Sequence, residues 1–179
     1  RGLGFHHAGL LPGLKGRVAA FGAWNVIASA VNPEKCGCPV NAGYAPFLME
    51  PMTPRLAFVN AMKRETPQVW DGEPFDAPAF YTAMEYIKVK KPRVLFLSLG
   101  ETDDWAHEGN YGEYLNAAHR VDSYLERLWT TLQSMPQYKG KTTMIFLPDH
   151  GRGSGPEDWT SHGQKIPDSK YIFMGFMGA

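Results

Sequence analysis

A nearly continuous apolar run, RVLFLSLG at residues 93–100, constrains the fold of this chain more than any other segment. Strands that alternate apolar and polar residues keep one face in water, whereas a run without alternation is typical of a strand buried on both faces of a parallel sheet. Pro92 precedes the run and ends the helical pattern before it. The sequence therefore predicts a central strand here, in an α/β fold with helices on both faces of a mostly parallel sheet.

The pattern of apolar residues and breakers predicts the other elements. Further strands are expected at residues 17–23, 141–151 and 170–178, and helices at residues 24–31, 53–65, 77–91 and 111–134. We expect the strand at residues 141–151 to be buried and central as well. Thr53 is expected to cap the second of these helices and Asp76 the third. The alternation of strands and helices favours parallel strands joined by helical crossovers.

Length and composition are those of an ordinary globular domain. Of the 179 residues, 44% are hydrophobic and 20% are charged, which excludes intrinsic disorder. Lys plus Arg and Asp plus Glu are equal at 18 each, so no net field would attract nucleic acid. No apolar run approaches the ~20 residues of a membrane span. Because the chain begins with Arg1 instead of Met, we expect residues 1–179 to form a single, partial domain, with residues 32–78 as a loop-rich insertion.

The two cysteines, Cys36 and Cys38, are separated by one glycine. Cysteines this close seldom bridge without strain, since a disulfide needs Cα atoms about 4.4–6.8 Å apart and suitable Cβ directions. We therefore predict two free or buried thiols. No metal site is expected here, because the segment lacks further sulfur or imidazole ligands.

Acidic and histidine side chains follow two of the predicted strands and precede a third. They are Asp103, His107, Asp149, His150 and His162. The carboxyl ends of parallel strands meet at one edge of a sheet, where the sites of α/β proteins form. A helical turn would place the first Asp and His on one face. Imidazole and carboxylate ligands suit Zn²⁺ or a similar ion, which would offset the cost of gathering carboxylates. The sequence thus predicts a metal cluster.

Each candidate also has an interpretation without a metal. Asp103 can cap a helix whose surface carries His107, and Asp149 can start a turn beside a hydrogen-bonded His150. The GRGSG segment that follows lacks the Lys-Ser/Thr ending of a phosphate loop. A flexible loop is expected there, and a contact between Arg152 and an anionic substrate stays open.

Three neighbouring residues are expected to have other roles. Asp104 is expected to cap the helix that begins near Tyr111 or to face solvent, with a ligand role left open. Glu101 is expected to be a loop charge, with a hydrogen bond to a metal ligand as the alternative. His119 is expected to be packed within, or exposed on, the helix at residues 111–134.

The order of these motifs resembles a known family. Asp103-x-x-x-His107 after a buried strand, then Asp149-His150, then His162, is similar to the catalytic half of the alkaline phosphatase superfamily. Within it, the resemblance is to the nucleotide pyrophosphatase/phosphodiesterase-like and phosphomutase-like branches. It covers the chain from residue 93 to its end and only loosely residues 17–31. An alkaline-phosphatase-like fold is thereby implied.

The resemblance implies a metal-dependent hydrolase of phosphodiesters or phosphomonoesters. Asp103, His107 and His162 would hold one ion, and Asp149 and His150 a second. The expected ions are Zn²⁺, with Mn²⁺ as the alternative. Two ions about 3.5–4 Å apart neutralise the transferred group, activate an alkoxide and stabilise the leaving oxygen. The implied partner is a small-molecule phosphate ester, with no nucleic acid, and the implied location is periplasmic or secreted, as for many relatives.

Enzymes of this superfamily also use a further Asp after the first strand and a Thr or Ser nucleophile at a helix start. The resemblance places neither in this chain, and we expect both in a part of the protein that precedes Arg1. The alternatives are a sulfatase-like relative, a phosphomutase-like isomerase and a non-catalytic metal-binding domain. The segment CGCPVNAG does not match the Cys-x-Pro-x-Arg motif of sulfatases.

Overall fold

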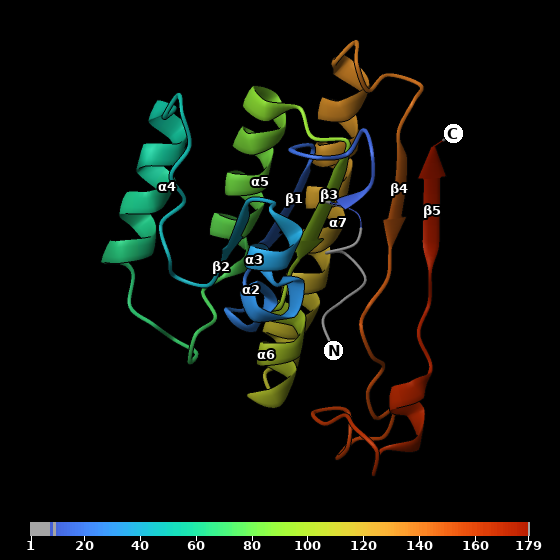
Figure 1. Cartoon of the computed structure of the whole chain (residues 1–179). Coiled ribbons are helices and arrows are strands. Elements are labelled where there is room, and N and C mark those ends of the chain that lie inside the picture. Colours follow the sequence, from blue (N-terminus) through green and yellow to red (C-terminus); the bar gives the residue numbers. More distant parts are fainter. Residues whose placement is uncertain (1–7, 9, 179) are drawn as a thin grey trace. The chain divides into compact units, whose positions relative to one another are not determined.

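The computed structural model describes residue 8 and residues 10–178 of the chain (Figure 1). The chain divides into two compact units, Arg1–Glu101 and Thr102–Ala179. No helix among the described residues combines the length and the apolar character that crossing a bilayer requires. The expectations of a single domain and of an insertion at residues 32–78 stay predictions.

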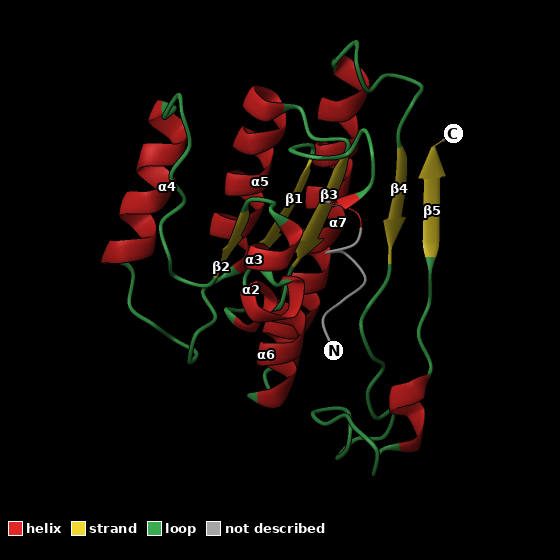
Figure 2. Cartoon of the chain, viewed as in Figure 1, coloured by secondary structure: helices red, strands yellow, loops and turns green. Residues whose placement is uncertain are grey.

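Parallel strands form the sheet of the first unit (Figure 2). They are β1 (Val18–Gly22), β2 (Val40–Ala42) and β3 (Val94–Ser98), in the order β2-β1-β3. Ala20 of β1 pairs with Val40 on one side and with Phe96 on the other. All of β1 is buried, because a central strand covered on both faces has no side in water. The α/β fold with a parallel sheet is confirmed.

The place of β3 in this sheet differs from the prediction. Within the described residues β3 pairs only with β1, and its residues are half-buried, so it is not the central strand. The shorter run VAAFG of β1 is central because β2 pairs with its other edge, in a segment that reads as turns in the sequence. The length and apolar character of a run do not by themselves decide its position in a sheet.

Helices connect these strands, and one more follows the last of them. They are α2 (Val26–Val31), α3 (Pro33–Cys36), α4 (Pro54–Glu65), α5 (Asp76–Lys90) and α6 (Glu101–His107), the last beginning at the final residue of the first unit. The helices predicted at residues 24–31, 53–65 and 77–91 are confirmed with small shifts at their ends. Thr53 caps α4 as predicted, since its Oγ1 accepts a hydrogen bond from the N–H of Leu56 at 3.1 Å. Asp76 does not cap α5; its Oδ1 accepts from the N–H of Gly100 at 2.6 Å.

Two apolar cores lie on opposite faces of β1, because successive side chains of a strand point to opposite sides. Ala19 and Phe21 belong to one core, which continues into α4 and α5 through Leu56, Ala83 and Tyr86. Val18 and Ala20 belong to the other, with Val31 and the two cysteines. The rings of Phe21 and Tyr86 lie 5.3 Å apart. Helices thus cover both faces of the sheet.

The cysteines form a disulfide, so the prediction of free thiols is wrong. Cys36 ends α3, and Gly37 follows in a left-handed conformation with φ of 61°. This turn brings the Cα atoms of Cys36 and Cys38 to 5.1 Å, within the range that a disulfide spans. Both side chains are buried, as the sequence suggested.

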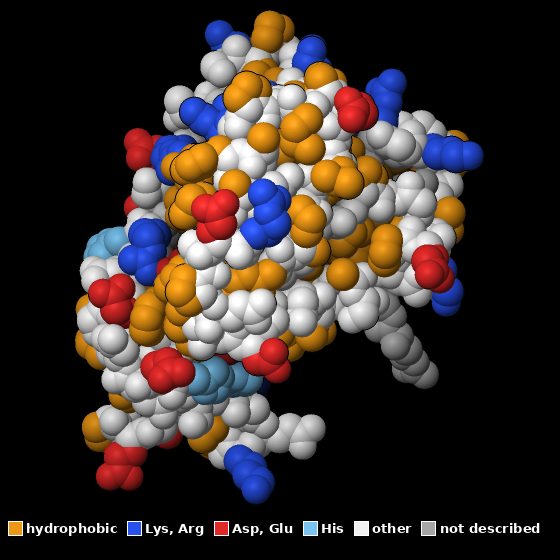
Figure 3. Space-filling view, turned by 90° about the vertical axis from the view of Figure 1, so that its left-hand side faces the viewer, with side chains coloured by type: hydrophobic (Ala, Val, Ile, Leu, Met, Phe, Trp, Pro, Cys, Tyr) orange, Lys and Arg blue, Asp and Glu red, His pale blue; other side chains and the backbone are white. Residues whose placement is uncertain are grey.

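Apolar side chains also gather on the surface around α4. Figure 3 faces this side and shows orange side chains between scattered charges. On α4, Leu56 is buried, whereas Phe58 and Met62 are 64% and 37% exposed. The helix therefore presents apolar residues both to the core and to solvent.

The second unit contains a long helix and a pair of strands. Its elements are α7 (Tyr111–Ser134), β4 (Thr143–Phe146), the 3-10 helix η1 (Pro167–Lys170) and β5 (Gly175–Gly178). Asn110 caps α7 through a 3.1 Å hydrogen bond from the N–H of Glu113 to its Oδ1. The helix predicted at residues 111–134 is confirmed.

β4 is not the buried parallel strand that the sequence predicts at residues 141–151. In the described part of the chain its partner is β5, which runs antiparallel, with Ile145 opposite Phe176. These two side chains are 56% and 67% exposed. An apolar run suits a parallel or an antiparallel ladder, so the pattern alone does not choose the partner.

Candidate metal centre

Helix α6 presents the first Asp and His pair. Asp103 and His107 are four residues apart in this helix, and one helical turn places them on the same face. Oδ2 of Asp103 lies 3.2 Å from Nε2 of His107. The side chains predicted to meet across a helical turn therefore do so.

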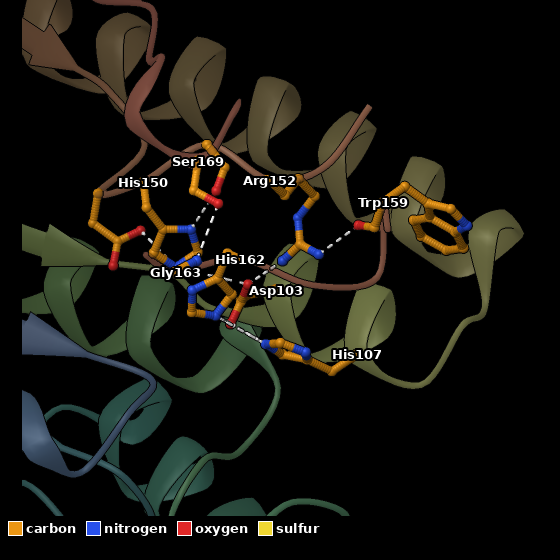
Figure 4. A network of polar contacts seen from close by, with 10 residues as sticks. Asp103, His107, His150, Arg152, Trp159, His162, Gly163 and Ser169 are labelled. Carbon is orange, nitrogen blue, oxygen red and sulfur yellow. Dashed lines mark hydrogen bonds and ion pairs between the residues drawn. The ribbon is translucent and has the colours of Figure 1, made fainter. Parts of the chain in front are cut away.

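Two further histidines reach Asp103 from the chain after β4 (Figure 4). The rings of His150 and His162 stack with centroids 3.7 Å apart and 15° between their planes. Nε2 of His150 lies 3.8 Å from Oδ1 of Asp103, and Nε2 of His162 lies 3.6 Å from Oδ2. Asp103, His150 and His162 each offer one ligand atom, and these atoms lie within 4.8 Å of one another.

The ligand atoms of Asp103, His107 and His162 form a compact triangle. Nε2 of His107 lies 3.0 Å from Nε2 of His162. Oδ2 of Asp103 lies 3.2 Å from the first of these nitrogens and 3.6 Å from the second. Ligands about 2.0–2.1 Å from a tetrahedral Zn²⁺ would be about 3.3 Å apart. Two ring nitrogens that face each other also repel unless a proton or a cation lies between them. The donor set and its spacing fit a divalent ion.

Asp149 lies at the margin of this group. Its Oδ1 is 3.6 Å from Nε2 of His150, but its side chain is 87% exposed. The structure thus brings the three predicted histidines to Asp103, and Asp149 contacts this group at His150.

Hydrogen bonds from two glycines to Ser169 position the loops that carry His150 and His162. The N–H of Gly151 donates to the carbonyl of Ser169 at 2.8 Å, and the N–H of Gly163 donates to Oγ of Ser169 at 3.0 Å. A Cβ at Gly151 would overlap the carbonyl oxygen of Tyr171. Glycine after His150 is therefore needed for the close approach of these two backbones.

Hydrogen bonding leaves one nitrogen of His150 available. Nδ1 of His150 lies 2.9 Å from the carbonyl oxygen of Gly151. Because a carbonyl oxygen only accepts, Nδ1 carries the proton of this hydrogen bond, and in the neutral ring Nε2 keeps its lone pair toward Asp103. This is the arrangement by which ligating histidines are commonly oriented.

The electrostatic surroundings also favour a neutral His162. Burial lowers the pKa of His162; the Asp103 carboxylate opposes this, and His150, His107 and Arg152 lower the pKa further. A neutral imidazole is the form that binds a metal.

Sequence reasoning missed the role of Arg152. The segment GRGSG suggests a flexible loop, yet the side chain of Arg152 is only 15% exposed. Its Nη2 hydrogen-bonds to Oδ1 of Asp103, and its Nη1 donates to the carbonyl oxygen of Trp159 at 2.8 Å. The sequence signal for this role was a basic residue two positions after His150, because a carboxylate such as Asp103 in a cluster of side chains needs a positive charge nearby.

The other neighbours also differ from expectation. Glu101 is 3% exposed and its Oε1 accepts from the N–H of Asp76 at 2.8 Å, so it is not a surface loop charge. Asp104 lies inside α6, which excludes its expected role as a cap of α7; that role belongs to Asn110. His119 is an exposed residue of α7.

Comparison with known proteins identifies the family. The family model described as type I phosphodiesterase/nucleotide pyrophosphatase matches residues 16–172, which is most of the chain. Neither the comparison with curated proteins nor that with solved structures gives a match. Enzymes of the matched family hydrolyse phosphoric esters, and the family is a member of the alkaline phosphatase superfamily. With its α/β fold and its histidine and aspartate cluster, this chain belongs to the type I phosphodiesterase/nucleotide pyrophosphatase family.

Proposed function

We propose that this chain supplies the metal-binding part of an enzyme that hydrolyses small-molecule phosphodiesters or phosphomonoesters with two divalent ions. The observation that carries the proposal is the triangle of Asp103 Oδ2, His107 Nε2 and His162 Nε2, with sides between 3.0 and 3.6 Å. Family membership supports phosphoric esters as the substrate class.

The proposed ligands divide into two sets. Asp103, His107 and His162 hold the first ion, and Asp149 and His150 hold the second. The 3.6 Å contact between Asp149 Oδ1 and His150 Nε2 supports the second pair, and the 3.8 Å contact between His150 Nε2 and Asp103 Oδ1 supports its proximity to the first. Imidazole and carboxylate donors favour Zn²⁺, with Mn²⁺ as the alternative.

Bound ions would neutralise charge on the phosphoryl oxygens, activate the attacking hydroxyl and stabilise the leaving oxygen. The residues of this chain keep the ligand atoms in place for that chemistry. The hydrogen bond of His150 to the Gly151 carbonyl fixes which ring nitrogen faces the site. The Asp103 carboxylate lies within 3.8 Å of a ring nitrogen of each of the three histidines, so a bound cation would find these donor atoms already gathered.

The nucleophile is proposed to come from outside this chain. In the superfamily, an Asp follows the first strand and a Thr or Ser begins a nearby helix. Here β1 ends at Gly22 and is followed by Ala23, Trp24 and Asn25, which include neither a carboxylate nor a hydroxyl. A Thr or Ser on a preceding segment would attack the phosphorus in line as the bond to the ester's leaving oxygen breaks and the alcohol departs, and water would then hydrolyse the covalent phosphoryl intermediate and restore the hydroxyl.

Hydrolysis by the full-length protein tests the proposal. Bis(4-nitrophenyl) phosphate and 4-nitrophenyl phosphate would be compared in the presence of added Zn²⁺ and after chelation. We expect metal-dependent release of nitrophenol, reduced at least about 100-fold in His107→Ala. The exposed His119 on α7 offers a matched control, and His119→Ala should retain wild-type rates.

The alternative functions give different outcomes in the same assay. Faster hydrolysis of 4-nitrophenyl sulfate than of either phosphate ester would indicate a sulfatase-like enzyme. Metal binding without hydrolysis of any of these esters would indicate a non-catalytic domain. Transfer of phosphate within a phosphorylated sugar, without release of inorganic phosphate, would indicate a mutase.

We also propose a periplasmic or secreted location. The disulfide between Cys36 and Cys38 supports it, because such bonds persist mainly in oxidising compartments. Fractionation of cells that express the full-length protein tests the location, and recovery in the cytosolic fraction with both thiols reduced would contradict it.

A further inference from the structure

The guanidinium of Arg152 joins two parts of the second unit that carry proposed metal ligands. Nη2 contacts Oδ1 of Asp103 on α6, and Nη1 donates to the carbonyl oxygen of Trp159, three residues before His162 (Figure 4). We propose that Arg152 is a positioning residue that fixes Asp103 as a one-oxygen ligand and holds the loop of His162 against it. This inference rests on the proposed function.

The two oxygens of Asp103 face different partners. Oδ2 lies 3.2 Å from Nε2 of His107 and 3.6 Å from Nε2 of His162, which makes it the oxygen within the triangle. Oδ1 is the oxygen that Arg152 contacts. Because the guanidinium holds Oδ1, only Oδ2 is left to complete the triangle with the two imidazoles. Outer hydrogen bonds of this kind orient carboxylate ligands at metal sites.

The loop between Arg152 and His162 is ordered by several internal contacts. The N–H of Gly153 donates to the carbonyl of Ser161 at 3.1 Å, and the N–H of Gly155 donates to Oδ1 of Asp158 at 2.6 Å. These contacts close the loop on itself. The guanidinium then fastens the closed loop to the carboxylate of Asp103, so the position of His162 depends on the bridge.

Aromatic rings support the loop and the arginine together. The Trp159 ring packs against Tyr111 and Tyr114, with centroid distances of 5.2 Å and 5.9 Å. The guanidinium carbon of Arg152 lies 6.0 Å from the centre of the Tyr114 ring. An arginine can stack on an aromatic ring while its planar fork donates to two acceptors, whereas a lysine has one compact ammonium group. The geometry therefore selects arginine and not merely positive charge.

Two effects of Arg152 on metal affinity oppose each other. Its positive charge repels a cation nearby, so removal of the charge alone would strengthen binding. Its contacts orient one ligand and the loop of another, so removal of the bridge would weaken binding, and loss of such an outer partner typically costs about 10–100-fold. The side chain is only 15% exposed and bridges two elements, and we expect the positioning effect to dominate.

Zinc titration of the purified full-length protein tests the inference. Binding of Zn²⁺ would be followed by competition with a chromophoric chelator in wild type, Arg152→Gln and Arg152→Lys. We expect both variants to bind the first ion about 10-fold or more weakly, because neither can bridge Asp103 and the Trp159 carbonyl. Arg120→Gln removes an arginine from the surface of α7, where Arg120 pairs with Glu113 at 3.7 Å, and should leave the affinity unchanged.

Cobalt substitution gives a readout that a loss of stability alone would not change. Tetrahedral Co²⁺ absorbs visible light more strongly than Co²⁺ with more ligands. If Arg152 keeps Oδ1 away from the ion, the absorption of Co²⁺-loaded Arg152→Gln should fall as Oδ1 becomes a second ligand atom, whereas Arg120→Gln should keep the wild-type spectrum. Thermal unfolding of each variant checks that it is folded at the temperature of the titration.

The outcomes separate this inference from the proposed function. Absence of Zn²⁺ binding by the wild type would overturn both. Tight binding by the wild type, with equal or tighter binding by Arg152→Gln and an unchanged Co²⁺ spectrum, would overturn the positioning role alone. If Arg152→Gln does not fold, the Zn²⁺ titration and the Co²⁺ spectrum of Arg152→Lys decide the question. A wild-type affinity for Zn²⁺ together with a wild-type Co²⁺ spectrum in Arg152→Lys would contradict the bridging role of Arg152.

Discussion

Asp76 and Glu101 exchange hydrogen bonds between the starts of helices α5 and α6. Oε1 of Glu101 accepts from the N–H of Asp76 at 2.8 Å, and Oδ1 of Asp76 accepts from the N–H of Glu101 at 3.4 Å and from that of Gly100 at 2.6 Å. Both side chains are buried, with 2% and 3% exposure. Each carboxylate thus satisfies a donor at the positive end of a helix, as in a capping box shared between two elements.

Removal of the Asp76 carboxylate should destabilise the protein. Asp76→Ala leaves buried N–H groups without their acceptor, and we expect a loss of about 1–3 kcal/mol in the free energy of unfolding, measured by urea denaturation. Asp76→Asn keeps an oxygen acceptor and should lose less than Asp76→Ala. Thr53→Ala, which removes the cap of α4, provides a reference of about 1 kcal/mol. Equal stability of Asp76→Ala and wild type would contradict the exchange.

His150 and His162 stack on each other but belong to different proposed ligand sets. The number of ions bound per chain should therefore change differently when each is removed. We expect Asp149→Ala and His150→Ala to lower the metal content from about two ions per chain to about one, because only the second set is lost. His162→Ala should instead weaken binding of the first ion. Metal analysis after dialysis measures these contents. Loss of both ions in every variant would show that the residues form one undivided site.

Lys63 should make stability depend on pH. The lysine is 3% exposed, its Nζ donates to Oδ1 of Asn41 at 2.7 Å, and burial lowers its pKa from 10.5 to about 8. The charged form is therefore disfavoured in the folded state. Well below pH 8 Lys63 is charged in both the folded and the unfolded protein, so the full cost of burying the charge lowers the stability. As the pH rises from about 8 toward 10.5, the folded protein releases the proton first, and the free energy of unfolding increases.

Comparison with Lys63→Met isolates this effect. The free energy of unfolding of wild type minus that of the variant should increase by about 2 kcal/mol between pH 8 and pH 10. Urea denaturation at several pH values measures it. A difference that is constant over this range would show that Lys63 keeps its ordinary pKa in the folded protein.

The Cys36–Cys38 disulfide should add modest stability. It closes a very short loop, so the loss of chain entropy in the unfolded state corresponds to only about 1–2 kcal/mol. Reduced and alkylated protein should be less stable than the oxidised form by that amount in urea denaturation. Mass spectrometry after alkylation under denaturing conditions without reductant should find no modified cysteine, and two modified cysteines would contradict the disulfide.

In the first unit β1, β3, α2, α4 and α5 could be predicted because their apolar patterns are local, whereas β2 and α3 lie in a segment that reads as turns. The runs that form β1 and β3 and the caps and prolines around α4 identify these elements without knowledge of their partners. The partner of a strand is not a local property. The apolar run of β4 therefore suggested a parallel strand, whereas its ladder with β5 is antiparallel. The Cys36–Cys38 bridge escaped prediction because it depends on the left-handed turn at Gly37.

In the candidate metal centre, the contact between Asp103 and His107 could be predicted because four-residue spacing places two side chains on one face of a helix. His150 and His162 are 12 residues apart, and their stacking depends on how the intervening loop closes. The same loop concealed Arg152, because glycine-rich sequence suggests mobility, while its closure here depends on contacts of Asp158 and Trp159 that only the fold reveals.

Metal content decides whether Asp103 and the histidines around it form a metal centre. The full-length protein and its Asp103→Asn variant would be loaded with Zn²⁺, dialysed and analysed by mass spectrometry of the metal, with His119→Ala as the control. We expect about two ions per chain in wild type and in His119→Ala, and loss of at least one ion in Asp103→Asn, because Asp103 contacts all three histidines. A wild-type protein that retains no Zn²⁺, or an Asp103→Asn variant that retains as much as wild type, would contradict it.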